Sequence, residues 1–170
     1  IRLRETSTLI HQIQYDRVTG VYSKEYFCQQ VREILFRNPD VKYDVLCSDI
    51  EDFKLINDTF GMAAGDRLLR QVAALCTQRL GDRGICGRLN ADQFACLLEH
   101  REDYADEMFT QYDSKINSGF GDLNVIMKYG IYTVEEAKKF GVELHYVNTG
   151  AVEDPVALLK EISGGTGYND

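Results

Sequence analysis

The most informative part of this sequence is the run Asp49-Ile50-Glu51-Asp52-Phe53-Lys54-Leu55-Ile56-Asn57-Asp58-Thr59-Phe60-Gly61-Met62-Ala63-Ala64-Gly65-Asp66. Residues 41–50 predict a buried strand that ends on acidic residues. Residues 53–60 then predict a short helix that a glycine breaks, and residues 64–80 predict a longer one. A carboxylate at a strand end can hold Mg²⁺, and Lys54 can neutralise phosphate. The run therefore indicates nucleotide chemistry.

The remaining elements complete an α/β fold. Further helices are expected over residues 1–14, 23–37 and 102–116, and further strands over residues 84–89, 93–98 and 123–132. Ser23 is the expected N-cap of the second helix, which ends at Asn38-Pro39. Asn90-Ala91 predicts a two-residue hairpin turn with Asn90 at positive φ. The order of elements predicts an α+β sandwich, with a central, mostly antiparallel sheet and helices on one face.

Composition narrows the class of protein. The 170 residues suit one domain with a core, and no apolar run is long enough to cross a membrane. A net charge of −8 argues against nucleic-acid binding, but not against one nucleotide held by a metal ion and a lysine. Because the chain begins at Ile1, we expect it to be part of a longer protein, which a membrane anchor outside this sequence could tether.

The cysteines predict buried free thiols in a reducing, cytoplasmic protein. There are five, no pair has the CxxC spacing, and most lie in apolar surroundings. The three histidines are scattered, which argues against a zinc site.

Asp49 and Asp92 are candidates to share a metal ion. Asp49 lies at the end of the first strand and Asp92 in the hairpin between the next two, so both can point to one edge of the sheet. Mg²⁺ held by two carboxylates can activate a 3′-hydroxyl and stabilise charge on the attacked phosphate. Such acidic pairs are common, and the pair alone leaves a structural or solvated role open.

Several motifs together resemble the GGDEF domain family, the diguanylate cyclases. Asp16-Arg17-Val18-Thr19-Gly20-Val21-Tyr22-Ser23-Lys24 is similar to the family's Asp-x-Leu-Thr-Gly-Leu-x-Asn-Arg motif, and residues 49–66 are similar to its metal and guanine segment. The motifs occur in order and at the family's spacing over residues 16 to 132. The resemblance implies a nucleotide-cyclase-like fold over residues 15–134, with residues 1–14 as an input connector.

The resemblance also implies the ligands of the metal and the phosphates. The side chains of Asp49 and Asp92 and the carbonyl of Ile50 would bind Mg²⁺. Lys54 would meet phosphate, and Lys54 and Asp92 would be the catalytic residues.

Three more residues would bind the substrate by the same resemblance. Asn57 and Asp66 would hydrogen-bond guanine. Phe53 would line the base and ribose pocket, although plain core packing is an equally open role for it.

The hairpin that gives the family its name is altered here. In place of Gly-Gly-Asp-Glu-Phe the chain reads Asn90-Ala91-Asp92-Gln93-Phe94, in which the metal acid survives but the two glycines and the glutamate do not. Glycines let backbone approach a ligand closely, whereas Asn90 and Ala91 add side-chain atoms there. Gln93 is uncharged and cannot act as a carboxylate. We therefore expect cyclase activity to be lost or very weak.

Two further family features are missing from the sequence. The Arg-x-x-Asp product-inhibition motif is replaced by Gly81 and Gly84, so we expect no feedback binding of cyclic di-GMP there. Residues 135–170 do not match the family's last helix and strand. They read as an atypical α-β-α segment, with a strand at 144–147, that resembles a fragment of a zinc-type medium-chain alcohol dehydrogenase. A divergent end of the GGDEF fold is the competing account.

The sequence thus predicts a degenerate GGDEF domain with a regulatory role in a bacterial cyclic di-GMP signalling protein. It would bind GTP with Mg²⁺, adjoin sensor or phosphodiesterase domains, and form a homodimer in some states. Two alternatives stay open: an active diguanylate cyclase that joins two GTP molecules, and a structural interaction module with an empty pocket.

Overall fold

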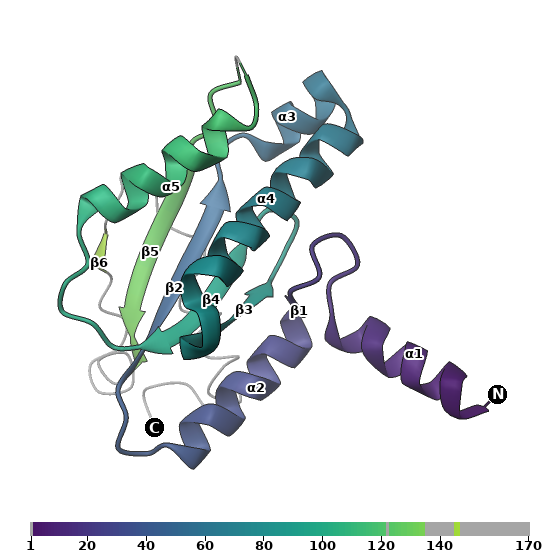
Figure 1. Cartoon of the computed structure of the whole chain (residues 1–170), viewed down its shortest axis with the longest axis vertical. Coiled ribbons are helices and arrows are strands. Elements are labelled where there is room, and N and C mark those ends of the chain that lie inside the picture. Colours follow the sequence, from purple (N-terminus) through teal and green to yellow (C-terminus); the bar gives the residue numbers. More distant parts are fainter. Residues whose placement is uncertain (1, 122, 135–144, 147–170) are drawn as a thin grey trace.

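A computed structural model describes residues 2–121, 123–134 and 145–146. In that part of the chain a six-stranded sheet runs in the order β1-β3-β4-β2-β5-β6 (Figure 1). The strands are β1 (Tyr22–Ser23), β2 (Tyr43–Ile50), β3 (Gly84–Arg88), β4 (Phe94–Glu99), β5 (Met127–Thr133) and β6 (His145–Tyr146). Neighbours are antiparallel except β1 and β3, which are parallel. The expected mostly antiparallel sheet is confirmed.

The described α-helices other than α5 begin and end within two residues of where local sequence signals place them. The α-helices are α1 (Arg2–Gln14), α2 (Lys24–Arg37), α3 (Phe53–Phe60), α4 (Met62–Leu80) and α5 (Asp106–Ser118). The Ser23 hydroxyl accepts a hydrogen bond from the Tyr26 backbone N–H at 3.3 Å, which confirms the expected N-cap. Gly61, with a φ of 91°, separates α3 from α4.

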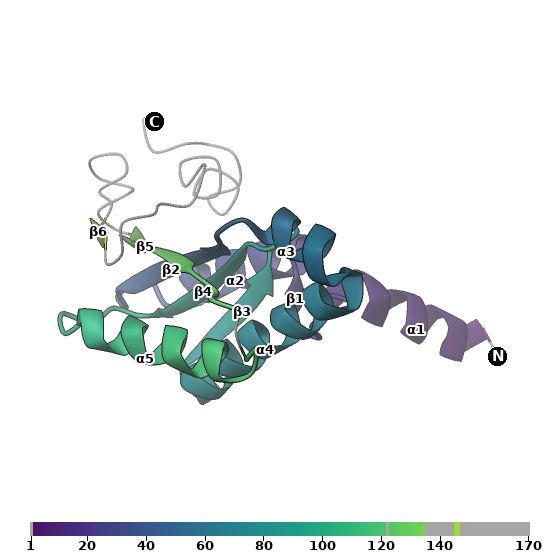
Figure 2. The same ribbon diagram turned by 90° about the horizontal axis from the view of Figure 1, so that it is seen from above.

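Helices cover both faces of the sheet, so the expectation of helices on one face is wrong (Figure 2). Successive residues of a strand point to opposite faces. Val45 of β2 therefore packs in the core under α2, around Phe27. Ile50 packs on the other face, in the core under α3, α4 and α5, around Leu68. The continuous apolar run of β2 is the sequence signature of a strand buried on both sides.

The hairpin between β3 and β4 is longer than the expected two-residue turn. Arg88 lies opposite Phe94 in the ladder, and the Leu89 N–H donates to the Gln93 carbonyl at 2.8 Å. The loop therefore spans residues 89–93. Asn90 is not at positive φ, because among the described non-glycine residues only Asp52 is, at 55°.

The last helix begins four residues later than expected, at Asp106 instead of residue 102. The preceding segment is held away from helical geometry by a buried acid of β2. The Arg101 N–H donates to Asp44 at 3.2 Å and the Tyr104 hydroxyl donates to it at 2.7 Å. These two tertiary contacts override the helical pattern of the local sequence.

Both ends of the described chain reach beyond the sandwich. Figure 1 shows α1 projecting from the body at the N-terminus. At the other end, β6 pairs with Gly130 and Ile131 of β5 and adds a strand to the sheet. β6 falls on the strand expected at 144–147, while the helices expected elsewhere in 135–170 lie outside the described residues. No described helix is long and apolar enough to span a bilayer.

Candidate nucleotide-binding site

The two candidate metal acids meet at one edge of the sheet. Asp49 is buried near the end of β2, with 9% of its surface exposed. The Ile50 N–H, one residue further on, donates to Oδ2 of Asp92 at 3.1 Å. Although 42 residues separate the two in sequence, the hairpin carboxylate is thus tied to the end of β2. The fold brings the three predicted metal ligands, Asp49, Ile50 and Asp92, together.

The donor set fits Mg²⁺. Two carboxylates and a backbone carbonyl are hard oxygen ligands, and Mg²⁺ completes its shell with phosphate oxygens and water. The half-buried setting of Asp92 leaves room on the solvent side for such ligands. Mg²⁺ bound there would polarise a phosphoryl oxygen of a nucleotide.

Arg88 holds the hairpin against the turn at residues 16–20. Its guanidinium donates to both carboxylate oxygens of Asp16 at 3.2 Å and to the Ala91 carbonyl at 2.6 and 3.0 Å. Asp16 also accepts the backbone and side-chain hydrogen bonds of Thr19, at 2.8 and 2.7 Å. Burial alone would raise the pKa of Asp16, but these bonds from Thr19 and the charge of Arg88 bring that pKa below its ordinary value. The carboxylate of Asp16 therefore stays ionised near neutral pH.

The altered hairpin residues bond to each other. The Asn90 side-chain amide donates to the Gln93 side-chain oxygen at 2.9 Å. In a Gly-Gly-Asp-Glu-Phe hairpin the donor of this bond is absent, because the glycine at the first position has no side chain. Two of the three replaced positions, Asn90 and Gln93, thus form a side-chain bridge across the loop that carries Asp92.

α3 and α4 gather the residues predicted to bind guanine. Gly65 lies so close to Asn57 that a Cβ at position 65 would collide with the Asn57 side chain and would lie 3.3 Å from Phe53. Asn57 therefore lies over the α4 backbone at Gly65, the residue that precedes Asp66. The side chains of Asn57 and Asp66 are both half-buried. Phe53 is 8% exposed and packs in the core under α4, which favours the packing role for its ring.

Lys54 lies at the start of α3, directly after the turn that follows the candidate metal ligands Asp49 and Ile50. Its side chain is exposed, so it is available to an anion. The turn itself is unusual because Asp52, its last residue, has a left-handed backbone with φ 55° and ψ 35°. Aspartate tolerates that conformation better than most residues. The turn lets α3 start immediately beside the strand end.

Two residues of this region, Arg88 and Gly65, were given no role from the sequence patterns alone. Arg88 is the last residue of β3 and Asp16 belongs to a motif 72 residues earlier. The parallel pairing of β1 with β3 places the segment that follows Asp16 beside the end of β3. For Gly65 the signal was a glycine inside a helical pattern, which often marks close approach of another element.

Comparison with known proteins identifies the class of domain. A family model described as "Diguanylate cyclase, GGDEF domain" matches residues 13–144. Because this match covers most of the chain, the chain belongs to the GGDEF domain family.

Individual relatives agree with that assignment. The cyclic di-GMP phosphodiesterase PdeB of Shewanella oneidensis is 33% identical over 100 residues, which are 56% of this chain and 11% of that protein. The diguanylate cyclase TpbB of Pseudomonas aeruginosa is 31% identical over 106 residues, 61% of this chain and 24% of that protein. The chain thus spans less than a quarter of the length of both curated relatives.

A solved structure shares the fold. A sensory box/GGDEF family protein from Caulobacter crescentus superimposes with a TM-score of 0.60 at 22% identity, over 71% of this chain and 83% of that one. This confirms the predicted α+β architecture of the nucleotide-cyclase-like kind.

Proposed function

We propose that this chain is a regulatory GGDEF domain that binds GTP with Mg²⁺ and turns it over slowly or not at all. In this proposal Asp49, Asp92 and the Ile50 carbonyl hold the metal ion. Lys54 meets the phosphates, while Asn57 and Asp66 bind guanine.

The bond between Asn90 and Gln93 is the observation that carries the loss of turnover. It places two side chains on the loop where the family has glycines and a glutamate. A reacting phosphate must be held to within about half an ångström of its productive position. The extra atoms keep the backbone amides of this loop from approaching it, and the amide of Gln93 supplies no charge.

Retained binding is supported by the other half of the site. Neither the bond from the Ile50 N–H to Asp92 nor the packing of Asn57 on Gly65 involves a side chain of the replaced hairpin positions. Binding without turnover follows when ground-state contacts survive and transition-state contacts are lost.

Calorimetric titration of GTP into the 170-residue chain, with Mg²⁺ and then with EDTA, tests the proposal. We expect saturable binding with Mg²⁺ that EDTA and Asp49→Ala abolish, and no cyclic di-GMP in the same sample by mass spectrometry. Product formation at an ordinary enzymatic rate would establish an active cyclase instead. No binding at millimolar GTP would leave a structural interaction module.

Restoring the family hairpin separates the causes of inactivity. The triple variant Asn90→Gly, Ala91→Gly and Gln93→Glu removes the side-chain bridge and returns the carboxylate. We expect it to form cyclic di-GMP above the wild-type level. Asp92→Asn added to the triple variant is the matched control and should remove that gain. A triple variant that binds GTP but forms no product would show that the hairpin is not what limits turnover.

The partners we propose follow from the relatives and from α1. One relative is a cyclic di-GMP phosphodiesterase and one solved neighbour is a sensory box/GGDEF family protein, so we propose that this domain adjoins domains of those kinds.

Leu9 and Ile13 of α1 are 58% and 67% exposed, which supports a homodimer joined through this helix. We retain residues 15–134 as the proposed domain core. None of the five cysteines, all of which lie in the described part of the chain, forms a disulfide, which supports a reducing, cytoplasmic setting.

A further inference from the structure

Three cysteines that are far apart in the sequence meet inside the fold. The sulfur atoms of Cys76, Cys86 and Cys96 all lie within 4.8 Å of one another. Cys86 on β3 and Cys96 on β4 are directly opposite each other in the antiparallel ladder and therefore share one face of the sheet. Cys76 reaches them from α4, which covers that face. Three elements thus converge on one cluster of thiols.

The geometry of the cluster suits a metal ion. Sulfur ligands lie about 2.3 Å from a bound ion, so three of them around one centre are about 4 Å apart. The cluster is close to that spacing already and needs shifts of less than about 1 Å to reach it. Among the described residues, no histidine or carboxylate joins the three thiols. An all-sulfur ligand set selects soft cations over Mg²⁺ or Ca²⁺.

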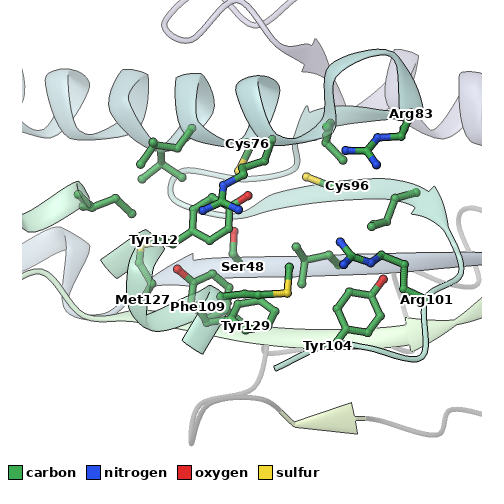
Figure 3. Close-up of a pocket in the computed structure, with 18 residues that line it drawn as sticks. Ser48, Cys76, Arg83, Cys96, Arg101, Tyr104, Phe109, Tyr112, Met127 and Tyr129 are labelled. Carbon is green, nitrogen blue, oxygen red and sulfur yellow. The ribbon is translucent and has the colours of Figure 1, made fainter. Parts of the chain in front are cut away.

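The cluster is accessible from a cavity between the sheet, α4 and α5. Cys76 and Cys96 line this cavity, which has a volume of about 150 Å³ (Figure 3). Cys76 is only half-buried, so an ion can reach it without unfolding of the helix. The cavity wall also includes three arginines, Arg79, Arg83 and Arg101, whose charge would offset that of thiolates.

We propose that Cys76, Cys86 and Cys96 form a three-thiolate site for one thiophilic d¹⁰ cation, either Zn²⁺ or Cu⁺. Each thiol releases its proton to solvent when its sulfur becomes a ligand, so binding of one ion releases up to three protons. Cu⁺ would be held by the three sulfurs. Zn²⁺ would take a fourth ligand, a water or small molecule, from the cavity. This site is separate from the GTP site and does not rest on the proposed function.

Competition titrations of the reduced chain test the site directly. Zn²⁺ is offered against a chromophoric zinc chelator, and Cu⁺ against bathocuproine disulfonate. We expect one equivalent of one of these ions to be retained, and Cys76→Ser to weaken its binding by at least about 100-fold. Cys28→Ala is the matched control, because Cys28 is also a helix cysteine packed on the sheet but belongs to the opposite core. It should bind the ion as the wild type does.

X-ray absorption on the loaded wild-type protein gives an answer that needs no variant. A shell of three sulfurs at about 2.3 Å is expected. Three results would overturn the proposal: a shell of nitrogen and oxygen only, no binding tighter than that of a variant with alanine at all three positions, or equal loss of binding in Cys28→Ala.

Discussion

The two ends of β2 each bury an aspartate, but they surround it differently. Asp44, near the start of the strand, is fully buried and receives hydrogen bonds from the Arg101 N–H and the Tyr104 hydroxyl, with His100 Nδ1 2.8 Å from its Oδ1. Asp49, near the other end, lies beside a backbone N–H that is bonded to a second carboxylate, Asp92. Hydrogen-bond donors from residues 101 and 104 meet at Asp44, whereas a second carboxylate is held close to the strand end that carries Asp49.

This difference agrees with a structural role for Asp44 and with the ligand-binding role that we propose for Asp49. A buried carboxylate is tolerated when hydrogen-bond donors and opposite charge replace the water that it loses. The Asp44 end supplies these from its own chain. At the Asp49 end two carboxylates belong to the same edge of the sheet, and a divalent cation held by both would offset their negative charge. Replacing Asp44 by the isosteric asparagine should therefore lower the stability of the fold. The same replacement at Asp49 should instead lower the affinity for the ligand.

Asp44→Asn should cause the largest loss of stability. The amide nitrogen would face groups that donate, and the charge that pairs with His100 would be gone. We expect the free energy of unfolding to fall by about 3 kcal/mol, measured by urea denaturation. Asp40→Asn is a control at an exposed acid just before the strand and should change stability by less than about 0.5 kcal/mol. Equal stability of the two variants would mean that the network around Asp44 contributes nothing.

Asp49→Asn should spare stability and remove the ligand. We expect a free energy of unfolding equal to or above that of the wild type without metal, because one of two neighbouring negative charges is removed. Mg²⁺-dependent GTP affinity should fall by about 100-fold, which corresponds to about 2.7 kcal/mol. Calorimetry and urea denaturation on the same preparation report both quantities. A large loss of stability together with unchanged GTP affinity would reverse the two roles.

Local signals predicted the elements around this site well. Residues 53–60 form the predicted helix with the same limits, because Gly61 ends it and a tight turn starts it. The helix predicted from residue 102 starts late because Tyr104 is bonded to Asp44, which is 60 residues away in sequence. Helix propensity carries no information about such a distant partner.

Partners that are distant in sequence also explain which features around the site the local signals did not predict. That the hairpin meets the strand end was predicted from topology, and the bond between the Ile50 N–H and Asp92 agrees with it. The hairpin turn was predicted too short because the Leu89 N–H pairs with the Gln93 carbonyl across a longer loop. The cysteine cluster has spacings of ten residues, unlike any local metal motif, and depends on the register of β3 with β4.

Gly65→Ala should affect the Asp49 end of the molecule and leave the Asp44 end unchanged. The new Cβ would collide with Asn57, whose side chain must rotate away, so we expect GTP affinity to fall by about tenfold. Overpacking costs about 1–3 kcal/mol, while alanine in a helix regains about 1 kcal/mol relative to glycine. The net stability loss should therefore be about 0–2 kcal/mol.

A double variant identifies the cause of that effect. In Asn57→Ala with Gly65→Ala the colliding atoms are absent, so stability should return toward that of Asn57→Ala alone while GTP binding stays weak. If the two substitutions were additive in stability, the contact between Asn57 and Gly65 would not be the source of the loss.

The smallest effect expected is a pH dependence at the Asp44 end. His100 Nε2 lies 2.7 Å from Glu102 and its Nδ1 lies 2.8 Å from Asp44, so both ring nitrogens donate only in the imidazolium form. The hydrogen bond to Glu102, followed by that to Asp44, raises the pKa of His100 above 6.5. A raised pKa means that the protonated ring stabilises the fold fully below about pH 6.5 and that this stabilisation is lost as the pH rises through the folded-state value. The wild type should therefore be more stable than His100→Gln by at most about 1 kcal/mol at about pH 6, with the difference shrinking toward about pH 9.

Thermal denaturation of both proteins across that pH range measures this difference in stability. Glu102→Gln should shift the midpoint of its decline to lower pH. A difference that grows with pH would mean that His100 is neutral in the fold, and the Asp44 end would then hold its carboxylate by the Arg101 N–H and Tyr104 hydroxyl alone.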